Sequence, residues 1–106
     1  MVNIEEFRKL ELRIARIREV IEHPNADKLY VITVDLGDKT KQVVAGIRPN
    51  YQKEELIGRQ VVVVDNLEPA VLRGVESQGM LLAASDEAGI SIVSPLREMQ
   101  LGSIVK

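Results

Sequence analysis

The stretch Leu12-Arg-Ile-Ala-Arg-Ile-Arg-Glu-Val-Ile21 begins the part of the chain that decides the fold. Apolar and polar residues alternate along it, a pattern that is typical of a half-buried β-strand. The alternation changes phase near Ala15, and such a change indicates a β-bulge and a bend. The sequence therefore predicts a long first strand that bends close to Ala15.

Four further strands are predicted downstream, at residues 29–36, 42–45, 60–64 and 80–84. A short helix is expected at residues 51–57, where Gly58 is placed to cap it. Residues 90–93 form one more extended segment, and residues 95–106 read as an extended tail. At the N-terminus, Asn3 and Glu6 have the spacing of a capping box, which predicts a short helix there.

The order strand, strand, strand, helix, strand, strand is that of the OB-fold, a five-stranded Greek-key barrel. The sequence thus predicts a single all-β domain over residues 1–106, with a short N-terminal helix and a C-terminal extension. OB-folds bind oligonucleotides over the face of strands 2 and 3 and at the loops joining strands 1–2 and 4–5. Those loops correspond to residues 23–28 and 66–79. The second of them makes up nearly all of a long irregular stretch that the sequence predicts at residues 65–79.

The first loop belongs to His23-Pro-Asn-Ala-Asp-Lys-Leu29. Pro24 fixes the direction of the chain, and Asn25 can hold a turn through its own backbone. Lys28 would then emerge at the mouth of the barrel, where it could pair with a phosphate while Asn25 meets a ribose or a base edge. The alternative is an ordinary stiff turn without a ligand.

The second loop is long for a compact domain, and long loops tend to be functional. Arg73 offers a planar fork for a phosphate. Ser77 and Gln78 can hydrogen-bond sugars or base edges, and Met80 presents a soft apolar surface for a base. The alternative is a structural crossover whose glycines, Gly74 and Gly79, only serve turns.

Charge restricts how RNA could be bound. Fourteen Lys and Arg face sixteen Asp and Glu, so the net charge is -2 and any binding must use a local patch. Arg13, Arg16 and Arg18 could extend a positive stripe toward Lys28, or they could form a solvated strand face. Aromatic residues make up only 3% of the chain, which favours recognition of folded RNA over stacking of single-stranded bases.

No catalytic constellation is recognisable. Ser77 lacks the spacing of a nucleophile elbow, the one histidine lies in the other loop, and no phosphate-cradling glycine motif is present. His23 and Asp27 supply too few ligands to hold a metal ion, and the chain has no cysteine. We therefore expect no enzymatic activity, cofactor or metal. Without a membrane-length apolar run or a signal-like N-terminus, we expect a cytoplasmic protein.

Four motifs resemble one known family, and the likeness extends from about Phe7 to Ile104. They are His23-Pro-Asn-Ala-Asp-Lys-Leu-Tyr-Val31, Val44-Ala-Gly46, Glu55-Leu-Ile-Gly58 and Arg73-Gly-Val-Glu-Ser-Gln-Gly-Met-Leu-Leu-Ala-Ala84. The family is the tRNA-binding domain, which is appended to many methionyl-tRNA synthetases and to phenylalanyl-tRNA synthetase beta chains. It also occurs in free-standing dimers and in cytokine-like synthetase cofactors.

The resemblance implies an OB-fold that binds the outer corner of tRNA with little sequence dependence and supplements a synthetase, most simply a methionyl one. It implies RNA-facing positions at Asn25, Lys28, Arg73, Ser77, Gln78 and Met80. It also implies a homodimer joined through flanking elements, which would bury Ile4, Phe7, Leu101, Ile104 and Val105. Glu68, Ala70 and Val71 depart from the family, which commonly carries Lys or Arg in this segment.

Two rival hypotheses remain open. A dimeric relative of the family is associated with protein export and chaperone-like peptide binding, and the apolar Ala70-Val-Leu72 run would suit a peptide groove. Alternatively, the chain only dimerises a synthetase, in which case Lys28 and Arg73 would be dispensable.

Overall fold

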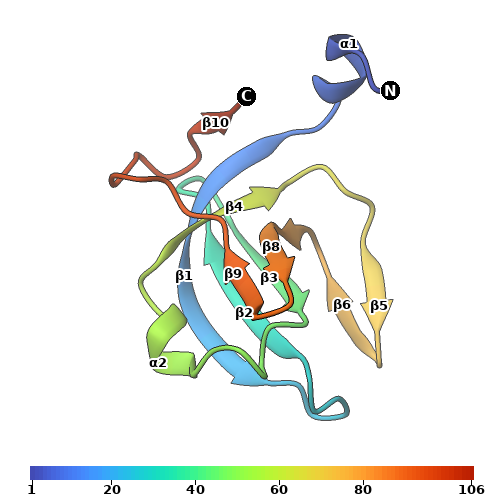
Figure 1. Cartoon of the computed structure of the whole chain (residues 1–106), viewed down its shortest axis with the longest axis vertical. Helices are drawn as coiled ribbons and strands as arrows, with labels where there is room; N and C mark the ends of the chain where they lie inside the picture. The colour runs from blue at the N-terminus through green and yellow to red at the C-terminus, as the bar shows by residue number, and fades with distance from the viewer.

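The computed structural model describes all 106 residues and shows a nearly closed antiparallel barrel of five strands (Figure 1). The strand order is β3-β2-β1-β4-β7, with α2 (Lys53–Leu56) between β3 and β4. The barrel strands are β1 (Leu12–Glu22), β2 (Tyr30–Asp35), β3 (Thr40–Ala45), β4 (Gln60–Val64) and β7 (Met80–Leu81). The predicted OB-fold is therefore confirmed.

The long first strand bends at a different residue from the one predicted. β1 pairs with β4 without interruption past Ala15, and its register against β2 shifts at Arg18 instead. At Ala15 only the buried face changes. Leu12 and Ile14 pack in a small cluster outside the barrel, whereas the residues after them face the main core. The phase change in the sequence thus marks a strand covered on both faces.

The barrel interior is filled by aliphatic side chains. β2 contributes every second side chain, Tyr30, Ile32 and Val34, to the main core, and α2 closes the bottom of the barrel with Leu56, which is fully buried. Each fully buried aliphatic side chain stabilises the fold by about 1.5–3 kcal/mol relative to an exposed one. The largest fully buried side chains are those of Ile17, Ile32, Leu36, Leu56, Val34, Val43, Val61 and Val63.

The barrel closes between β3 and the segment before β7 through one backbone bond and several side-chain bonds rather than a regular ladder. The Gln42 N–H donates to Gln78 Oε1 at 2.9 Å, and the Gln78 N–H donates to the Gln42 carbonyl at 2.8 Å. The Val44 N–H donates to Ser77 Oγ at 3.0 Å. Two side chains from the second loop therefore satisfy backbone donors along this seam.

The prediction that residues 65–79 are irregular is wrong, because this stretch carries a β-hairpin. β5 (Ala70–Leu72) pairs with β6 (Val75–Ser77) across the two-residue turn Arg73-Gly74. Both turn residues have positive φ, 53° and 87°, which is the conformation of a tight type I′ hairpin turn. Strands of only three residues leave too little periodicity to be recognised in the sequence.

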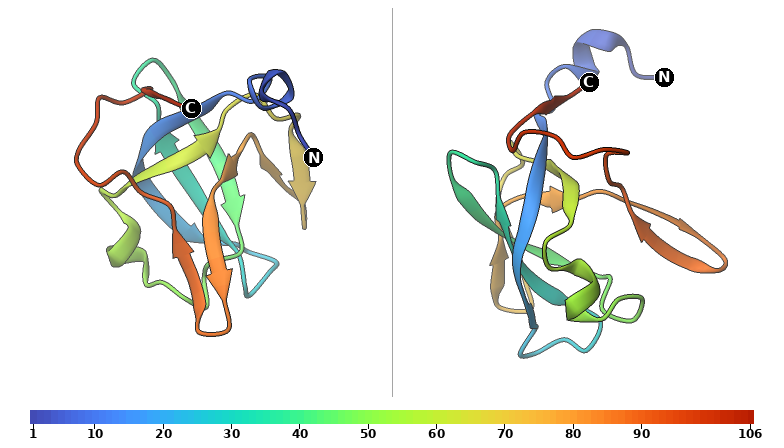
Figure 2. Two further views of the ribbon diagram at one scale, coloured as in Figure 1. Left: turned by 45° about the horizontal axis from the view of Figure 1, so that its top comes forward. Right: turned by 90° about the vertical axis from the view of Figure 1, so that its left-hand side faces the viewer.

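The predicted fifth strand, residues 80–84, is in fact divided between two sheets. Only β7 stays in the barrel, and the chain then leaves it to form a second hairpin from β8 (Ala83–Asp86) and β9 (Gly89–Ile92). This hairpin projects from the barrel in the right-hand view of Figure 2. Leu82 joins the two parts, because its N–H donates to Val62 and its carbonyl accepts from Val93.

The two ends of the chain lie at the same end of the barrel, opposite the β1–β2 loop (Figure 1). The N-terminal helix α1 (Ile4–Phe7) has the predicted capping box between Asn3 and Glu6. The tail ends in β10 (Ile104–Val105), which pairs with the start of β1. No helix in the structure is long and apolar enough to cross a membrane.

Candidate nucleic-acid interface

The two loops that the sequence singled out lie side by side (Figures 1 and 2). The buried imidazole of His23 connects them: Nε2 lies 2.8 Å from the Leu72 carbonyl oxygen at the end of β5. Asn25 Nδ2 donates to the carbonyl of Arg73 at 3.4 Å. The structure thus brings Asn25, Lys28 and Arg73 to one end of the barrel on two hydrogen-bonded segments.

Arg73 lies at the tip of the β5–β6 hairpin in an unfavourable backbone conformation. It is the only non-glycine residue with positive φ in the chain. For an arginine this left-handed conformation costs roughly 1 kcal/mol, whereas glycine or asparagine would adopt it readily. The side chain is exposed and forms no ion pair. Residues with a strained backbone cluster at functional sites, so the exposed guanidinium of Arg73 is a candidate for binding a ligand.

Lys28 is likewise exposed and forms no ion pair. Half of the fourteen cationic side chains pair with a carboxylate within 4 Å, so only the other half are free to meet a phosphate. The pairing cations are Arg13, Arg16, Arg18, Lys39, Lys41, Arg48 and Lys53. Lys28 and Arg73 are the free cations of the two loops that the hydrogen bonds of His23 and Asn25 join; we call these the clasped loops.

The positive stripe considered along the first strand does not form. Arg13 pairs with Asp38 and Asp65, Arg16 with Glu98, and Arg18 with Asp35. These arginines are therefore neutralised locally, and they are not an extension of the Lys28 surface. The bond from the Gly37 N–H and the Arg18 guanidinium together lower the pKa of Asp35, so that carboxylate stays charged.

Asp65 is the most strongly perturbed carboxyl group. Its side chain is 4% exposed, and three cations surround it: Arg13 at 3.0 Å, Lys39 at 3.0 Å and Lys41 at 2.7 Å. Burial alone would raise its pKa, but the bonds from Lys41, Arg13 and Lys39 outweigh that effect and lower the pKa to about 2. This cluster ties the end of β4 to β1 and β3, so we assign it to the barrel and not to the loop site.

Ser77 and Gln78 lie on the barrel seam. Ser77 is 5% exposed, and its hydroxyl accepts from Val44 and donates to the Gly79 carbonyl at 3.0 Å. Gln78 is half-buried, with its amide bonded to Gln42 and Glu76. Both side chains are thus used within the fold. Their predicted contact with RNA remains a prediction, and Ser77 offers little surface for it.

We expect Ser77→Ala to lower the free energy of unfolding by about 1–3 kcal/mol, because the buried Val44 N–H would lose its acceptor. Urea unfolding of the variant measures this loss. Ser91→Ala, at an exposed serine of β9, is the control and should unfold like the unchanged protein. Equal stability of both variants would contradict the seam role of Ser77.

Met80 lies on an apolar pocket of about 350 Å³ that neither Lys28 nor Arg73 lines. The pocket runs between the end of β3 and the start of β8, and Met80 is 48% exposed on its rim. It adjoins the β1–β2 loop at Gly46, where an added Cβ would lie 3.7 Å from the Leu29 side chain. An apolar surface is thus available beside the cationic loops.

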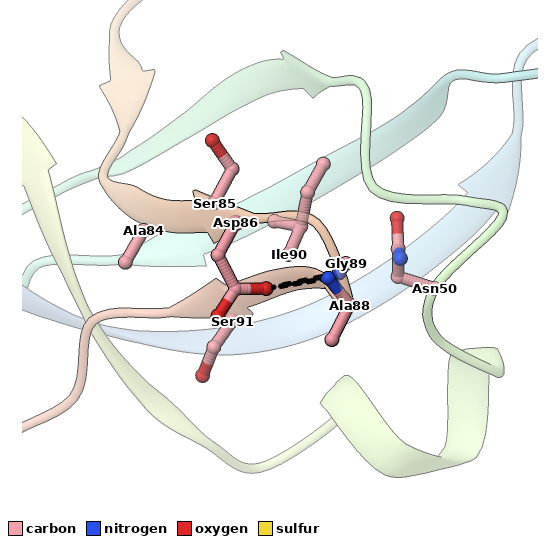
Figure 3. A pocket seen from close by; sticks show the side chains of 8 residues that line it. All are labelled: Asn50, Ala84, Ser85, Asp86, Ala88, Gly89, Ile90 and Ser91. Carbon is pink, nitrogen blue, oxygen red and sulfur yellow. Dashed lines mark hydrogen bonds between the residues drawn. The ribbon is translucent and has the colours of Figure 1, made fainter.

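A second hollow of about 380 Å³ lies beside the turn of the β8–β9 hairpin, facing Asn50 (Figure 3). Its single carboxylate, Asp86, accepts from the N–H groups of Ala88 at 2.8 Å and Gly89 at 3.2 Å. Asp86 therefore stabilises its own turn. The hollow contains no cation, and none of the predicted site residues lines it. No group of three or more metal-binding side chains is found in the chain.

The fold and the loop pair define an OB-fold binding domain whose loops are placed where this fold holds oligonucleotides. The chain belongs to the tRNA-binding domain family: the family model described as "Putative tRNA binding domain" matches residues 12–104. It is 55% identical over 105 residues, 99% of this chain, to the methionine–tRNA ligase of Pyrococcus furiosus. The chain spans only 14% of the length of that relative.

Solved structures of similar proteins carry two different descriptions. A methionyl-tRNA-synthetase-related protein of Pyrococcus horikoshii superimposes with a TM-score of 0.93 at 31% identity, covering 100% of this chain and 98% of that one. The chaperone CsaA of Bacillus anthracis superimposes with a TM-score of 0.92 at 29% identity, covering 100% and 99%. The shared barrel therefore does not by itself separate the two functions.

Proposed function

We propose that this chain is a non-catalytic tRNA-binding domain that holds tRNA at the clasped β1–β2 loop and β5–β6 hairpin. The observation that carries the proposal is Arg73, a free cation kept at a strained hairpin tip beside the loop of Asn25 and Lys28. A guanidinium and an ammonium at one end of the barrel suit two phosphates of one RNA backbone. Family membership and the synthetase relatives support tRNA as the RNA.

The proposed target is the folded outer corner of tRNA, read with little sequence dependence. Only three aromatic side chains exist, and Tyr30 and Tyr51 point their hydroxyls into the fold, where each forms hydrogen bonds. The chain therefore presents no aromatic platform on which single-stranded bases could stack. Contacts to phosphates and 2′-hydroxyls suit a folded RNA instead.

We further propose that the domain supplements an aminoacyl-tRNA synthetase, most simply a methionyl one, in the cytoplasm. A weak tRNA contact near a synthetase would raise the local concentration of its substrate. Glu68, Ala70 and Val71 are exposed on and before β5, where added cations would strengthen RNA binding. We therefore expect a modest and strongly salt-dependent affinity.

Gel shifts with tRNA and with a single-stranded RNA of the same length, over a series of salt concentrations, test this function. We expect a shift of tRNA at low salt that weakens steeply as salt rises, and a weaker shift of the single strand. Equal binding of both RNAs, or no binding of either RNA at low salt, would contradict the proposed function.

We also propose a homodimer joined through the ends of the chain. α1 buries none of its own residues, and Ile4, Phe7 and Ile104 are 59%, 37% and 60% exposed. They surround an apolar pocket of about 420 Å³ with Arg8 and Lys106. Leu101 and Val105 lie half-buried on the same tail. A four-residue helix with no packing partner gains stability when a second copy covers it.

We expect Phe7→Glu to shift the protein to a monomer, because a carboxylate would be buried in the apolar contact. Sedimentation at micromolar concentration measures the change. Val71→Glu is the control, because it places the same charge on an apolar side chain that is 70% exposed and far from α1 in the sequence. This variant should leave the assembly unchanged. A monomeric parent protein would contradict the dimer.

The rival function is chaperone-like peptide binding, and one observation favours it. The pocket beside Met80 is lined mainly by apolar side chains between two strand edges, which could receive an extended apolar peptide. Suppression of aggregation of an unfolded protein, together with no tRNA shift, would establish this function instead. A pure dimerisation scaffold would show neither activity, and Lys28 and Arg73 would be dispensable.

A further inference from the structure

His23 is the only histidine of the chain, and it lies 4% exposed between the two loops of the proposed RNA site. We propose that His23 is a positioning residue: it clamps the β5–β6 hairpin to the β1–β2 loop, so that Arg73 and Lys28 meet one RNA together. This role rests on the proposed tRNA binding. Nothing in it requires that the imidazole touch RNA.

The hydrogen bonds of the imidazole define one protonation form. Nδ1 accepts the backbone N–H of Asn25 at 2.9 Å, so it carries no proton. Nε2 must then carry the proton and donate to the Leu72 carbonyl at 2.8 Å. The neutral Nε2–H tautomer is the only form of histidine that makes both bonds at once. Nδ1 shapes the loop, and Nε2 reaches across to the hairpin.

The β5 side of the hairpin and its turn depend on this link, because β6 is bonded to β3 at Glu76 and Ser77 whereas β5 has no bond to the barrel strands. All three residues of β5 are exposed, and β5 pairs only with β6. From outside the hairpin, only His23 and Asn25 hydrogen-bond to residues 70–75. The Asn25 bond is the longer of the two, at 3.4 Å against 2.8 Å. The imidazole is therefore the principal link between the tip that carries Arg73 and the loop that carries Lys28.

Two substitutions separate the two bonds of the imidazole. His23→Asn keeps the local bond, because an asparagine oxygen accepts from the N–H two residues later, but it cannot reach Leu72. His23→Gln places an amide N–H near the position of Nε2 and so keeps the bond to Leu72, but it gives up the local one. If His23 only stabilised its own turn, the asparagine variant would be the milder of the two.

We expect the opposite order. His23→Asn should lower tRNA affinity about tenfold, because a loosened hairpin must be ordered again on binding. His23→Gln should restore most of that affinity. Both affinities are measured on protein whose urea unfolding shows it to be fully folded. Retained affinity in His23→Asn, or a loss in His23→Gln as large as in His23→Asn, would overturn the proposal.

Two readouts without RNA keep this test separate from the test of function. Since the chain has one histidine, ¹⁵N spectra of its imidazole report one tautomer, and we expect an unprotonated Nδ1 and a protonated Nε2. Amide exchange in β5 and β6 should speed up in His23→Asn but not in His23→Gln. The Nδ1–H tautomer, or unchanged exchange in His23→Asn, would refute the clasp itself. A clasp confirmed in a protein that binds no tRNA would refute the proposed function instead.

Discussion

Replacing Asp65 by asparagine should cost the fold about 3 kcal/mol, the usual loss when one partner of a buried ion cluster is removed. The carboxylate is 4% exposed and lies within 3.0 Å of three cations, Arg13, Lys39 and Lys41. An amide cannot offset the charge of any of them. Lys41, only 20% exposed, would lose its one carboxylate partner, and Arg13, 14% exposed, would keep only the exposed Asp38.

The same carboxylate makes the stability of the fold depend on acid. Its pKa is about 2 in the folded protein and 3.8 when unperturbed, so the unfolded chain takes up a proton first as pH falls. Its contribution is complete above pH 3.8 and is lost between pH 3.8 and about 2. Asp65→Asn should therefore unfold with a flatter dependence on pH in this window than the unchanged protein.

Urea unfolding at pH 7 and at several values between pH 4 and pH 2 measures both effects. Asp38→Asn is the matched control, because Asp38 also pairs with Arg13, at 3.2 Å, but is 62% exposed. We expect the control to lose only about 0.5 kcal/mol, as is usual for an exposed ion pair. Similar losses for the two variants would show that burial gives Asp65 no special weight.

The longer strands of this barrel were predictable because their burial leaves a pattern within a single segment: alternation where one face is buried, and an apolar run where both are. β4 was predicted with its observed bounds, Gln60–Val64, since a short run of four β-branched valines favours a strand covered on both sides. The hairpin at Arg73 was missed for a physical reason. A two-residue turn with positive φ usually carries asparagine or glycine first, and an arginine there conceals the turn.

The links that build the site were beyond the reach of sequence patterns. His23 was placed correctly in a turn, but its partner Leu72 lies 49 residues away, and nothing local to either residue signals the bond. Asp65 and Arg13 are 52 residues apart and pair only because β4 lies beside β1. Local composition located the loops, whereas only the closed barrel shows that they touch.

Replacing Arg73 by asparagine should make the protein more stable and a weaker RNA binder at the same time. Asparagine tolerates the positive φ of 53° that strains arginine, so we expect a gain of roughly 0.5–1 kcal/mol in the free energy of unfolding. Loss of a charge-assisted phosphate contact, about 1.5 kcal/mol, should lower tRNA affinity about tenfold. Urea unfolding and filter binding of the same preparations measure the two changes.

Combining Arg73→Asn with Lys28→Gln should lower tRNA affinity about a hundredfold, if each cation meets its own phosphate. The slope of log affinity against log salt should then fall in magnitude by about 2, one for each lost phosphate contact. Arg97→Asn removes an exposed, unpaired arginine from the tail and should change neither quantity. A slope as steep in the double variant as in the Arg97 control would mean that RNA is held elsewhere. Increased stability without any loss of affinity would leave the strain at Arg73 without a functional reason.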